Sequence, residues 1–288
     1  GVVKGNMDRL DFKGLNVKLP TAFQAKASGH AENLNDLKRL KADVNFDAKA
    51  HDVGFVQELL PNDLKKDIRI PKNISMKGNV KANGDKYSGN ITMNEGGGNM
   101  KATFSYDNAK QSYTADVDAN RLQLQHFAPN YGLSPFTGNV ELKGQGTDFT
   151  SPKTRLNAKA NIKNFKYGGY DLNNISADAT MENGRTKAKI NSNNPLLKGL
   201  VDLDALISKD HLRGTIMGDV GKIDLKKLGL VDNTLSASGC MHLDFDSDMK
   251  RCHRLRGLVS DLTIHDERKY YRPDDMVLDM FSCPDTTH

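Results

Sequence analysis

The sequence predicts an all-β protein whose strands follow one another in a long, mostly antiparallel meander. Three observations lead there: apolar and polar residues alternate with period two, glycine-rich motifs separate the alternating runs, and helical periodicity is scarce. Successive side chains of a strand point to opposite faces, so each run has one apolar and one wet face. Such strands favour antiparallel pairing, because buried parallel strands are apolar throughout.

The alternating runs give the expected strands in chain order, roughly fifteen to eighteen in all. Their apolar positions should share one face of the sheet. We expect the following residues to line it: Ile74, Met76 and Val80; Met100, Ala102 and Phe104; Tyr113, Ala115 and Val117; Leu156, Ala158, Ala160 and Ile162; Ile175, Ala177 and Ala179; Val201, Leu203 and Ala205; Met241, Leu243 and Phe245.

Turn motifs fall between these runs. The motifs are Asn83-Gly84-Asp85, Glu95 to Gly98, Asp107-Asn108, Gly168-Gly169 and Glu182 to Arg185. Asn-Gly and Gly-rich pairs supply the positive φ angles that hairpin turns need. They predict hairpins rather than long crossover connections.

Three short stretches carry a helical pattern, namely Gly54 to Leu64, Leu122 to Ala128 and Ile223 to Leu228. Each is followed by or contains Pro or Gly, the usual helix stops. They divide the chain into four expected segments: 1–52, 53–120, 121–222 and 223–288. We expect about twenty residues at the end of the last segment to be irregular.

Composition narrows the function. The net charge is +5 and its charges are interleaved, which gives no nucleic-acid footprint. No apolar run is long enough to span a bilayer. The chain starts at Gly1 without a signal-like pattern, so we read it as a fragment whose anchor or export signal would lie outside it. The chain has three cysteines, Cys240, Cys252 and Cys283. This number is odd and small for 288 residues, so it does not indicate a disulfide framework.

A sheet this long must cover its apolar face. Twisted sheets of more than about ten strands curl or split, and closure into a barrel or sandwich is the ordinary solution. The expected inward residues are mostly small or aliphatic, which favours an open U-shaped groove instead. An apolar surface of that extent marks a ligand or membrane partner, and acyl chains are its natural occupant. Alternation alone fits both the open groove and the closed sandwich.

Candidate chemical sites are weak. Two sets of residues could bind a metal: Cys240, His242, Cys252 and His253 for zinc, and Asp244, Asp246 and Asp248 for calcium. Neither has the spacing of a known site, and a wet strand face explains them better. Gly96 to Gly98 leads into a strand, so we expect a turn rather than a phosphate loop. The charged run from Asp261 to Asp275 is expected to be solvated, and no nucleophile–base set indicates an enzyme.

A repeated module gives a family resemblance. A half-helix, a Pro or Gly, a loop and a Gly-containing strand follow one another at Leu122 to Gln145 and at Ile223 to Phe245, and the tail Tyr270 to Asp279 adds to the likeness. The chain thereby resembles the TamB-like translocation and assembly proteins of the AsmA superfamily, Bacteroidetes type, as an interior fragment. The family's membrane helix and C-terminal domain are not identified here.

The resemblance implies a periplasmic bridge, anchored in the inner membrane of a Gram-negative envelope. It implies a β-groove for phospholipid transport toward the outer membrane and an Omp85-type barrel partner, met through a region outside the fragment. It implies no catalytic residues and no cofactor. Two rivals stay open: a structural or adhesive β-repeat protein with a closed core and a binding polar face, and a β-rich enzyme with converging carboxylates.

Overall fold

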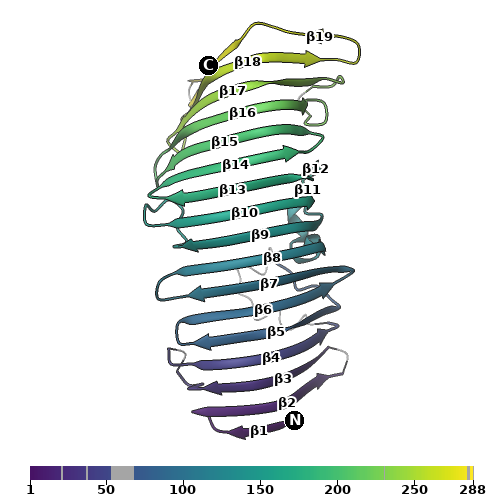
Figure 1. The fold of residues 1–288 in the computed structure, drawn as a ribbon, viewed down its shortest axis with the longest axis vertical. Coiled ribbons are helices and arrows are strands. Elements are labelled where there is room, and N and C mark those ends of the chain that lie inside the picture. The colour runs from purple at the N-terminus through teal and green to yellow at the C-terminus, as the bar shows by residue number, and fades with distance from the viewer. Residues whose placement is uncertain (21, 37, 53–67, 230, 284–285, 288) are drawn as a thin grey trace. The chain divides into compact units, whose positions relative to one another are not determined.

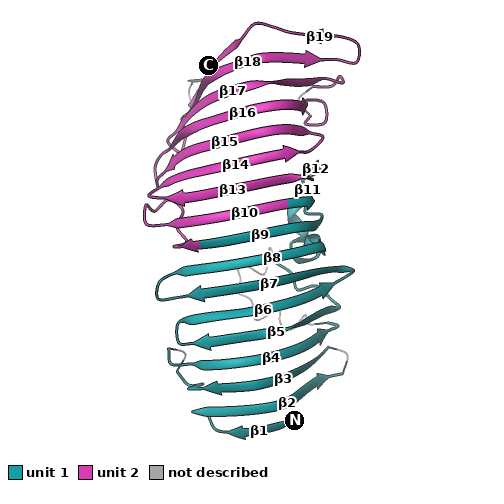
Figure 2. Cartoon of the chain, viewed as in Figure 1, with its two compact units in different colours: residues 1–143, 162–169 teal, residues 144–161, 170–288 magenta. Residues whose placement is uncertain are grey.

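The computed structural model describes residues 1–20, 22–36, 38–52, 68–229, 231–283 and 286–287 (Figure 1). Most of these residues are in strands, and very few are helical. The chain divides into two compact units (Figure 2): unit 1 holds Gly1–Lys143 and Ile162–Gly169, and unit 2 holds Gly144–Asn161 and Tyr170–His288. The division passes through β9 (Pro135–Gln145) and β10 (Arg155–Asn164). No described helix is long and apolar enough to cross a membrane.

Unit 1 is built from consecutive strands. They are β1 (Val2–Gly5), β2 (Arg9–Leu19), β3 (Phe23–Glu32), β4 (Lys41–Ala50), β5 (Ile74–Asn83), β6 (Lys86–Glu95), β7 (Gly98–Asp107) and β8 (Ser112–Gln123), most of β9, and the two-residue β11 (Lys166–Tyr167). The helix α3 (Leu124–Phe127) and the 3-10 turn η1 (Pro129–Tyr131) follow β8.

Unit 2 continues in the same manner. Besides most of β10, its strands are β12 (Tyr170–Asp171), β13 (Ile175–Glu182), β14 (Arg185–Asn193), β15 (Leu197–Ile207), β16 (Leu212–Asp224), β17 (Ser236–Ser247), β18 (His253–His265), β19 (Tyr270–Tyr271), β20 (Met276–Cys283) and β21 (Thr286–Thr287). Apart from the two-residue elements β11, β12, β19 and β21, the strands agree with the fifteen to eighteen expected.

The pairing within each unit confirms the predicted all-β, antiparallel meander. In unit 1, β1 to β8 pair in chain order, and in unit 2 the same holds for β13 to β18, after which β18 pairs with both β19 and β20. No pairing among the described strands joins the first strand of a unit to its last. The sheet is therefore open rather than a closed barrel, which is consistent with a curled groove.

A line of bulges crosses unit 2. The register shifts at Lys198/Gly199 on β15, between Val220 and Ile223 on β16, and between Ser238 and Cys240 on β17. Gly199 pairs with Val220, and Val220 with Gly239, so the irregularities sit at one level of neighbouring strands. Each bulge adds twist and bends its strand. The register places the extra residues on β16 and β18, so these two strands carry the local irregularity.

Five turn motifs fall where the sequence predicts them. The pairs Asn83–Lys86, Glu95–Gly98 and Glu182–Arg185 close two-residue hairpin loops. Asn183 and Gly184 both have positive φ, at 53° and 73°, as a type I′ turn requires. Residues 108–111 form the turn after β7, and 168–169 the turn between β11 and β12.

Of the three predicted helices, one is present, one is wrong and one lies outside the described residues. The expected helix at Leu122 to Ala128 is present as α3, only four residues long. The expected helix at Ile223 to Leu228 is wrong: Ile223 and Asp224 complete β16 by pairing with Ala237 and Ser236, and residues 225–229 form a turn. A six-residue stretch cannot offset the cost of helix nucleation against these strand pairs. The expected helix at Gly54 to Leu64 lies outside the described residues.

The compact core of unit 1 lies at one end of its strands. Ile74, Met93, Ala119 and Leu122 are each less than one-tenth exposed and contact one another. Ile70, Met76, Met100, Leu124, Phe127 and Phe136 pack against this cluster. A backbone hydrogen bond from Arg69 N to Phe127 O ties the chain before β5 to α3. Here α3 and its neighbours cover the apolar face.

Candidate functional site

The candidate site is the apolar face of the sheet, taken separately in each unit. In unit 2 the register sets its residues in rows that cross seven strands, from β13 to β20. The three rows are Ala177, Ile190, Val201, Gly218, Met241, Val259 and Met276; Ala179, Ala188, Leu203, Ile216, Leu243, Gly257 and Leu278; and Met181, Thr186, Ala205, Gly214, Phe245, Leu255 and Met280. At about 4.8 Å between strands, each row is roughly 29 Å long.

Unit 1 repeats this arrangement over β4 to β8. Its rows are Ala48, Met76, Met93, Met100 and Ala119; Phe46, Gly78, Ile91, Ala102 and Val117; and Val44, Val80, Gly89, Phe104 and Ala115. Tyr113 pairs with Tyr106 on the same face. In β10, half-buried Leu156, Ala158, Ala160 and Ile162 alternate with exposed residues. The register thus places the predicted lining residues of β5 to β8 on one face of unit 1 and those of β13 to β17 on one face of unit 2.

The apolar face of unit 2 is half-open. Among the residues of unit 2 expected to line the face, Ala205 is buried and all the others are half-buried. In unit 2 every described strand except the two-residue β12 belongs to one and the same sheet, and no helix is described there. No described element of unit 2 therefore forms a second layer over the rows, whereas a closed sandwich would bury them fully.

Large side chains on this face lie flat over glycines of the next strand. Phe104 pairs with Gly89, and a Cβ atom on Gly89 would come within 3.1 Å of the Phe104 ring. Likewise, a Cβ atom on Gly214 would lie 2.9 Å from Phe245 Cζ. The face is filled by side chains that lie down on it, so it stays shallow and smooth.

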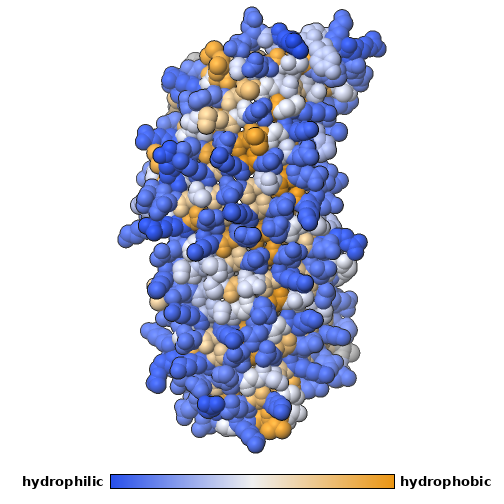
Figure 3. All heavy atoms as spheres, viewed as in Figure 1, coloured by the Kyte–Doolittle hydropathy of each residue, from blue (hydrophilic) through white to orange (hydrophobic). Residues whose placement is uncertain are grey.

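The opposite face of unit 2 is bound together by charge pairs across the strands. Arg185 donates two hydrogen bonds to Asp204, at 2.7 and 2.6 Å. The hydrogen bond from Arg185 holds the pKa of Asp204 below its usual value. Thr215 Oγ1 donates to Asp244 at 3.0 Å, and Arg254 and Arg256 both contact Asp279. Hydrophilic side chains cover most of the surface shown in Figure 3, with hydrophobic patches between them.

A hollow of about 1060 Å³ lies mainly on this polar face, and no pattern in the sequence indicates it. Its lining includes Arg185, Asp204, His211, Met217, His242 and Arg254. His211 Nε2 is 3.2 Å from Asp246 Oδ2. A smaller hollow of about 260 Å³ lies among Phe245, Leu255, Met280 and their neighbours, where the apolar rows reach β20. Both hollows depend on how neighbouring strands bend, which a period-two pattern does not encode.

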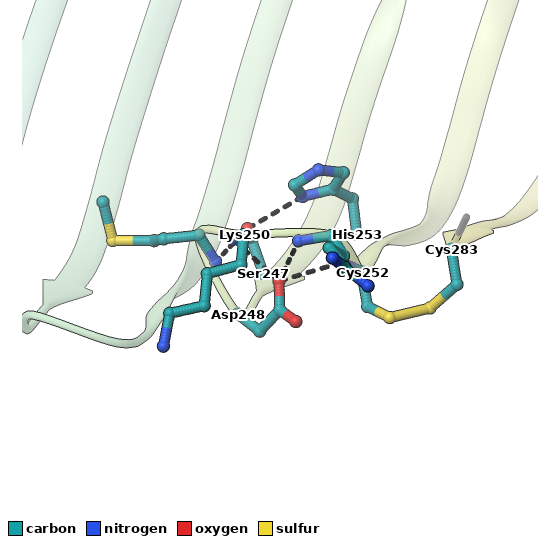
Figure 4. Close-up of a disulfide and its surroundings, with 8 residues drawn as sticks. Ser247, Asp248, Lys250, Cys252, His253 and Cys283 are labelled. Carbon is teal, nitrogen blue, oxygen red and sulfur yellow. Dashed lines mark hydrogen bonds between the residues drawn. A yellow bond between two sulfur atoms is a disulfide. The ribbon is translucent and has the colours of Figure 1, made fainter.

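A disulfide joins Cys252 to Cys283 (Figure 4), a pairing that the sequence analysis did not predict. Cys252 therefore cannot serve as a zinc ligand with Cys240, His242 and His253. Among the described residues no group of three or more His, Cys, Asp or Glu side chains is placed to hold a metal ion. Cys240 is a half-buried free thiol on β17.

The aspartates considered for calcium have structural roles. Asp244 and Asp246 are exposed on the polar face of β17, as the strand interpretation predicts. Asp248 Oδ1 accepts hydrogen bonds from the backbone N–H groups of Lys250, Arg251 and Cys252. These donors, the one on Cys252 most, lower the pKa of Asp248 to about 2.

The other candidates are ordinary surface features. Gly96 and Gly97 form the two-residue turn between β6 and β7, as predicted. In the run from Asp261 to Asp275, residues 267–275 are exposed. Asp266 caps its turn by accepting hydrogen bonds from the backbone N–H groups of Arg268 and Lys269.

Comparison of the chain with protein-family models, with curated proteins and with solved structures finds no match.

Proposed function

We propose that the apolar face is a groove that holds phospholipid acyl chains and guides them between membranes without catalysis. The chain would be the interior part of a bridge like the TamB-like proteins of the AsmA superfamily, which its sequence resembles. One observation carries the proposal: in unit 2, rows that are apolar except for Thr186 cross seven strands, and no second sheet or helix of described residues covers them.

The chemistry of the rows suits a hydrocarbon ligand. They hold aliphatic side chains, glycines and flattened Met and Phe side chains, and few groups that form hydrogen bonds. Each methylene group of an acyl chain that is buried on such a surface contributes about 0.8 kcal/mol to the free energy of binding, wherever along the row it lies. Because this attraction has no direction, an acyl chain can slide along a row without meeting a specific binding step. A conduit needs that property, and a high-affinity pocket lacks it.

The proposed location is the periplasm, with an inner-membrane anchor and an Omp85-type outer-membrane barrel contacted through regions outside this chain. The bond between Cys252 and Cys283 supports an extracytoplasmic site, because disulfides form and persist in oxidising compartments. The proposed role is transport of phospholipid toward the outer membrane, linked to outer-membrane protein assembly and secretion.

A charge on the apolar face tests the proposal. Leu203 is half-buried in the middle row of unit 2, so Leu203→Asp should expel hydrocarbon from the groove, and Val201→Asp should do the same one row away. The matched control is Leu206→Asp on the same strand. Leu206 is 40% exposed on the polar face, where its register partners are Arg185 and Arg213.

The measurement is phospholipid co-purified with the protein, extracted and quantified by mass spectrometry. We expect lipid with the wild type and with Leu206→Asp, and a large loss with Leu203→Asp and Val201→Asp while the circular dichroism stays that of a β-sheet. A wild-type protein free of lipid, expressed in a Gram-negative periplasm, would contradict the proposal. Unfolding of both charged variants would indicate a closed core instead.

A second function has one observation in its favour. The hollow of about 1060 Å³ on the polar face of unit 2 suits the recognition of a partner by charged side chains, as in a structural or adhesive β-repeat protein. Arg213 forms no ion pair there among the described residues, so it has a free guanidinium to offer. Partner capture that Arg213→Glu abolishes and Leu203→Asp leaves intact would favour this alternative.

A further inference from the structure

The strand β20 buries little and is an edge strand except at its last two residues, Ser282 and Cys283, which pair with Thr287 and Thr286 of β21. It pairs with the first half of β18, from His253–Ser282 to Val259–Met276. Met276, Val277 and Met280 are 43%, 81% and 55% exposed. The apolar burial that usually holds a strand in place is therefore small, and the ladder of hydrogen bonds faces solvent on one side.

Side-chain contacts add only solvent-screened attraction to this pairing. Asp279 contacts Arg254 at 3.1 Å and Arg256 at 3.3 Å, and the side chains of all three are at least two-fifths exposed. The guanidinium of Arg254 lies 6.0 Å from the centre of the Phe281 ring. Exposed ion pairs contribute little to stability. Apart from these weak contacts, β20 is held by its backbone pairing with β18 and, at its last two residues, with β21.

The disulfide adds a covalent tie. The last pair of the β18–β20 ladder is His253–Ser282. Cys252 precedes His253 and Cys283 follows Ser282, so the two cysteines lie opposite each other one position beyond this pair, with Cα atoms 4.3 Å apart. The turn before β18 holds Cys252 from its own side, because the carboxylate of Asp248 accepts the Cys252 N–H and those of two preceding residues (Figure 4). One cysteine thus sits on a preformed turn and the other at the end of the edge strand.

We propose that Cys252–Cys283 is a redox latch that decides which strand forms the edge of unit 2. With the bond intact, β20 covers β18. A small dithiol opens the bond: its thiolate attacks one sulfur to form a mixed disulfide, and its second thiol then closes a cyclic disulfide, leaving two cysteine thiols. β20 then leaves the sheet, and the N–H and C=O groups of β18 that faced it become free to pair with another strand.

Hydrogen exchange measured by mass spectrometry tests the latch on the full chain. The protein is folded and oxidised first, then compared with and without dithiothreitol. We expect exchange at least about tenfold faster on reduction in residues 276–283 and 253–259, and no change in β14 to β16. The Cys252→Ser/Cys283→Ser variant should match the reduced protein, and Cys240→Ser should match the oxidised wild type.

Three results would overturn the proposal. The first is unchanged exchange in β18 and β20 on reduction, which would mean that the ladder holds β20 without the disulfide. The second is faster exchange throughout unit 2, which would make the bond a global staple. The third is alkylation of three thiols per chain in protein purified from an oxidising compartment without reductant. Because the wild type is reduced after folding, a double-serine variant that fails to fold does not remove the test.

Discussion

Met241 lies across Gly218 of the neighbouring strand on the apolar face of unit 2. The two residues are register partners, and a Cβ atom on Gly218 would come within 2.5 Å of Met241 Cε. The methionine fills the space that a side chain at position 218 would occupy. This relationship keeps the row shallow, because a long side chain spreads over the sheet rather than standing up from it.

Replacing Gly218 or Gly214 by Ala should therefore lower the stability of the protein by different amounts. The Cβ atom of Gly218→Ala meets the side chain of Met241, at Cε and Cγ, and no backbone atom, so the methionine can turn away and stability should change by less than about 1 kcal/mol. The Cβ atom of Gly214→Ala meets backbone, with Asp204 O at 2.3 Å and Ala205 Cα at 2.7 Å, and should cost about 1–3 kcal/mol. Thermal unfolding should show a clearly lower midpoint for Gly214→Ala alone, and equal midpoints would contradict the packing described.

The core cluster of unit 1 makes a separate prediction. Leu122 is 6% exposed between α3 and the strand ends, so Leu122→Ala should remove about 2–5 kcal/mol of stability. The control is Leu19→Ala on β2, where the leucine is 47% exposed and truncation should change little. Thermal or denaturant unfolding measures both. A midpoint for Leu122→Ala within a degree of the control would mean that this cluster does not stabilise unit 1.

Acid should weaken the turn that holds Cys252. The folded-state pKa of Asp248 is about 2, below the ordinary value of 3.8, so the ionised carboxylate stabilises the turn above about pH 4. That contribution is lost as the pH falls through 2. Asn keeps an acceptor oxygen without a titrating proton, so the difference in thermal midpoint between wild type and Asp248→Asn should change between pH 4 and 2 and stay constant above. A constant difference down to pH 2 would show that Asp248 titrates normally.

Much of the fold follows from the sequence because strand patterning and turn chemistry are local. Alternation at Ala177, Ala179 and Met181 requires only that these side chains share one face, and the Asn183-Gly184 turn fixes the register with β14. The weak point is helix prediction from a few residues. Ile223 is apolar at a helical spacing, yet pairing with Ala237 on β17 decides its structure.

The site was predictable in its residues but not in its surroundings. Leu203 could be assigned to the apolar face from its neighbours in sequence, whereas the lack of a second sheet or helix over this face among the described residues of unit 2 depends on tertiary packing. The disulfide illustrates the same limit. Cys252 and Cys283 are 31 residues apart, and they meet only because β20 returns to pair with β18. Three cysteines without a pattern gave no way to choose a pair.

The most direct test of the central claim is photocrosslinking in the cell envelope at two positions of one strand. A benzophenone amino acid replaces Leu203 on the apolar face or Leu206 on the polar face, in the protein expressed in a Gram-negative periplasm. An open lipid groove predicts a phospholipid adduct at position 203 and none at position 206, detected by mass spectrometry after irradiation. Adducts at position 203 that are only to protein, or equal lipid labelling at both positions, would contradict it.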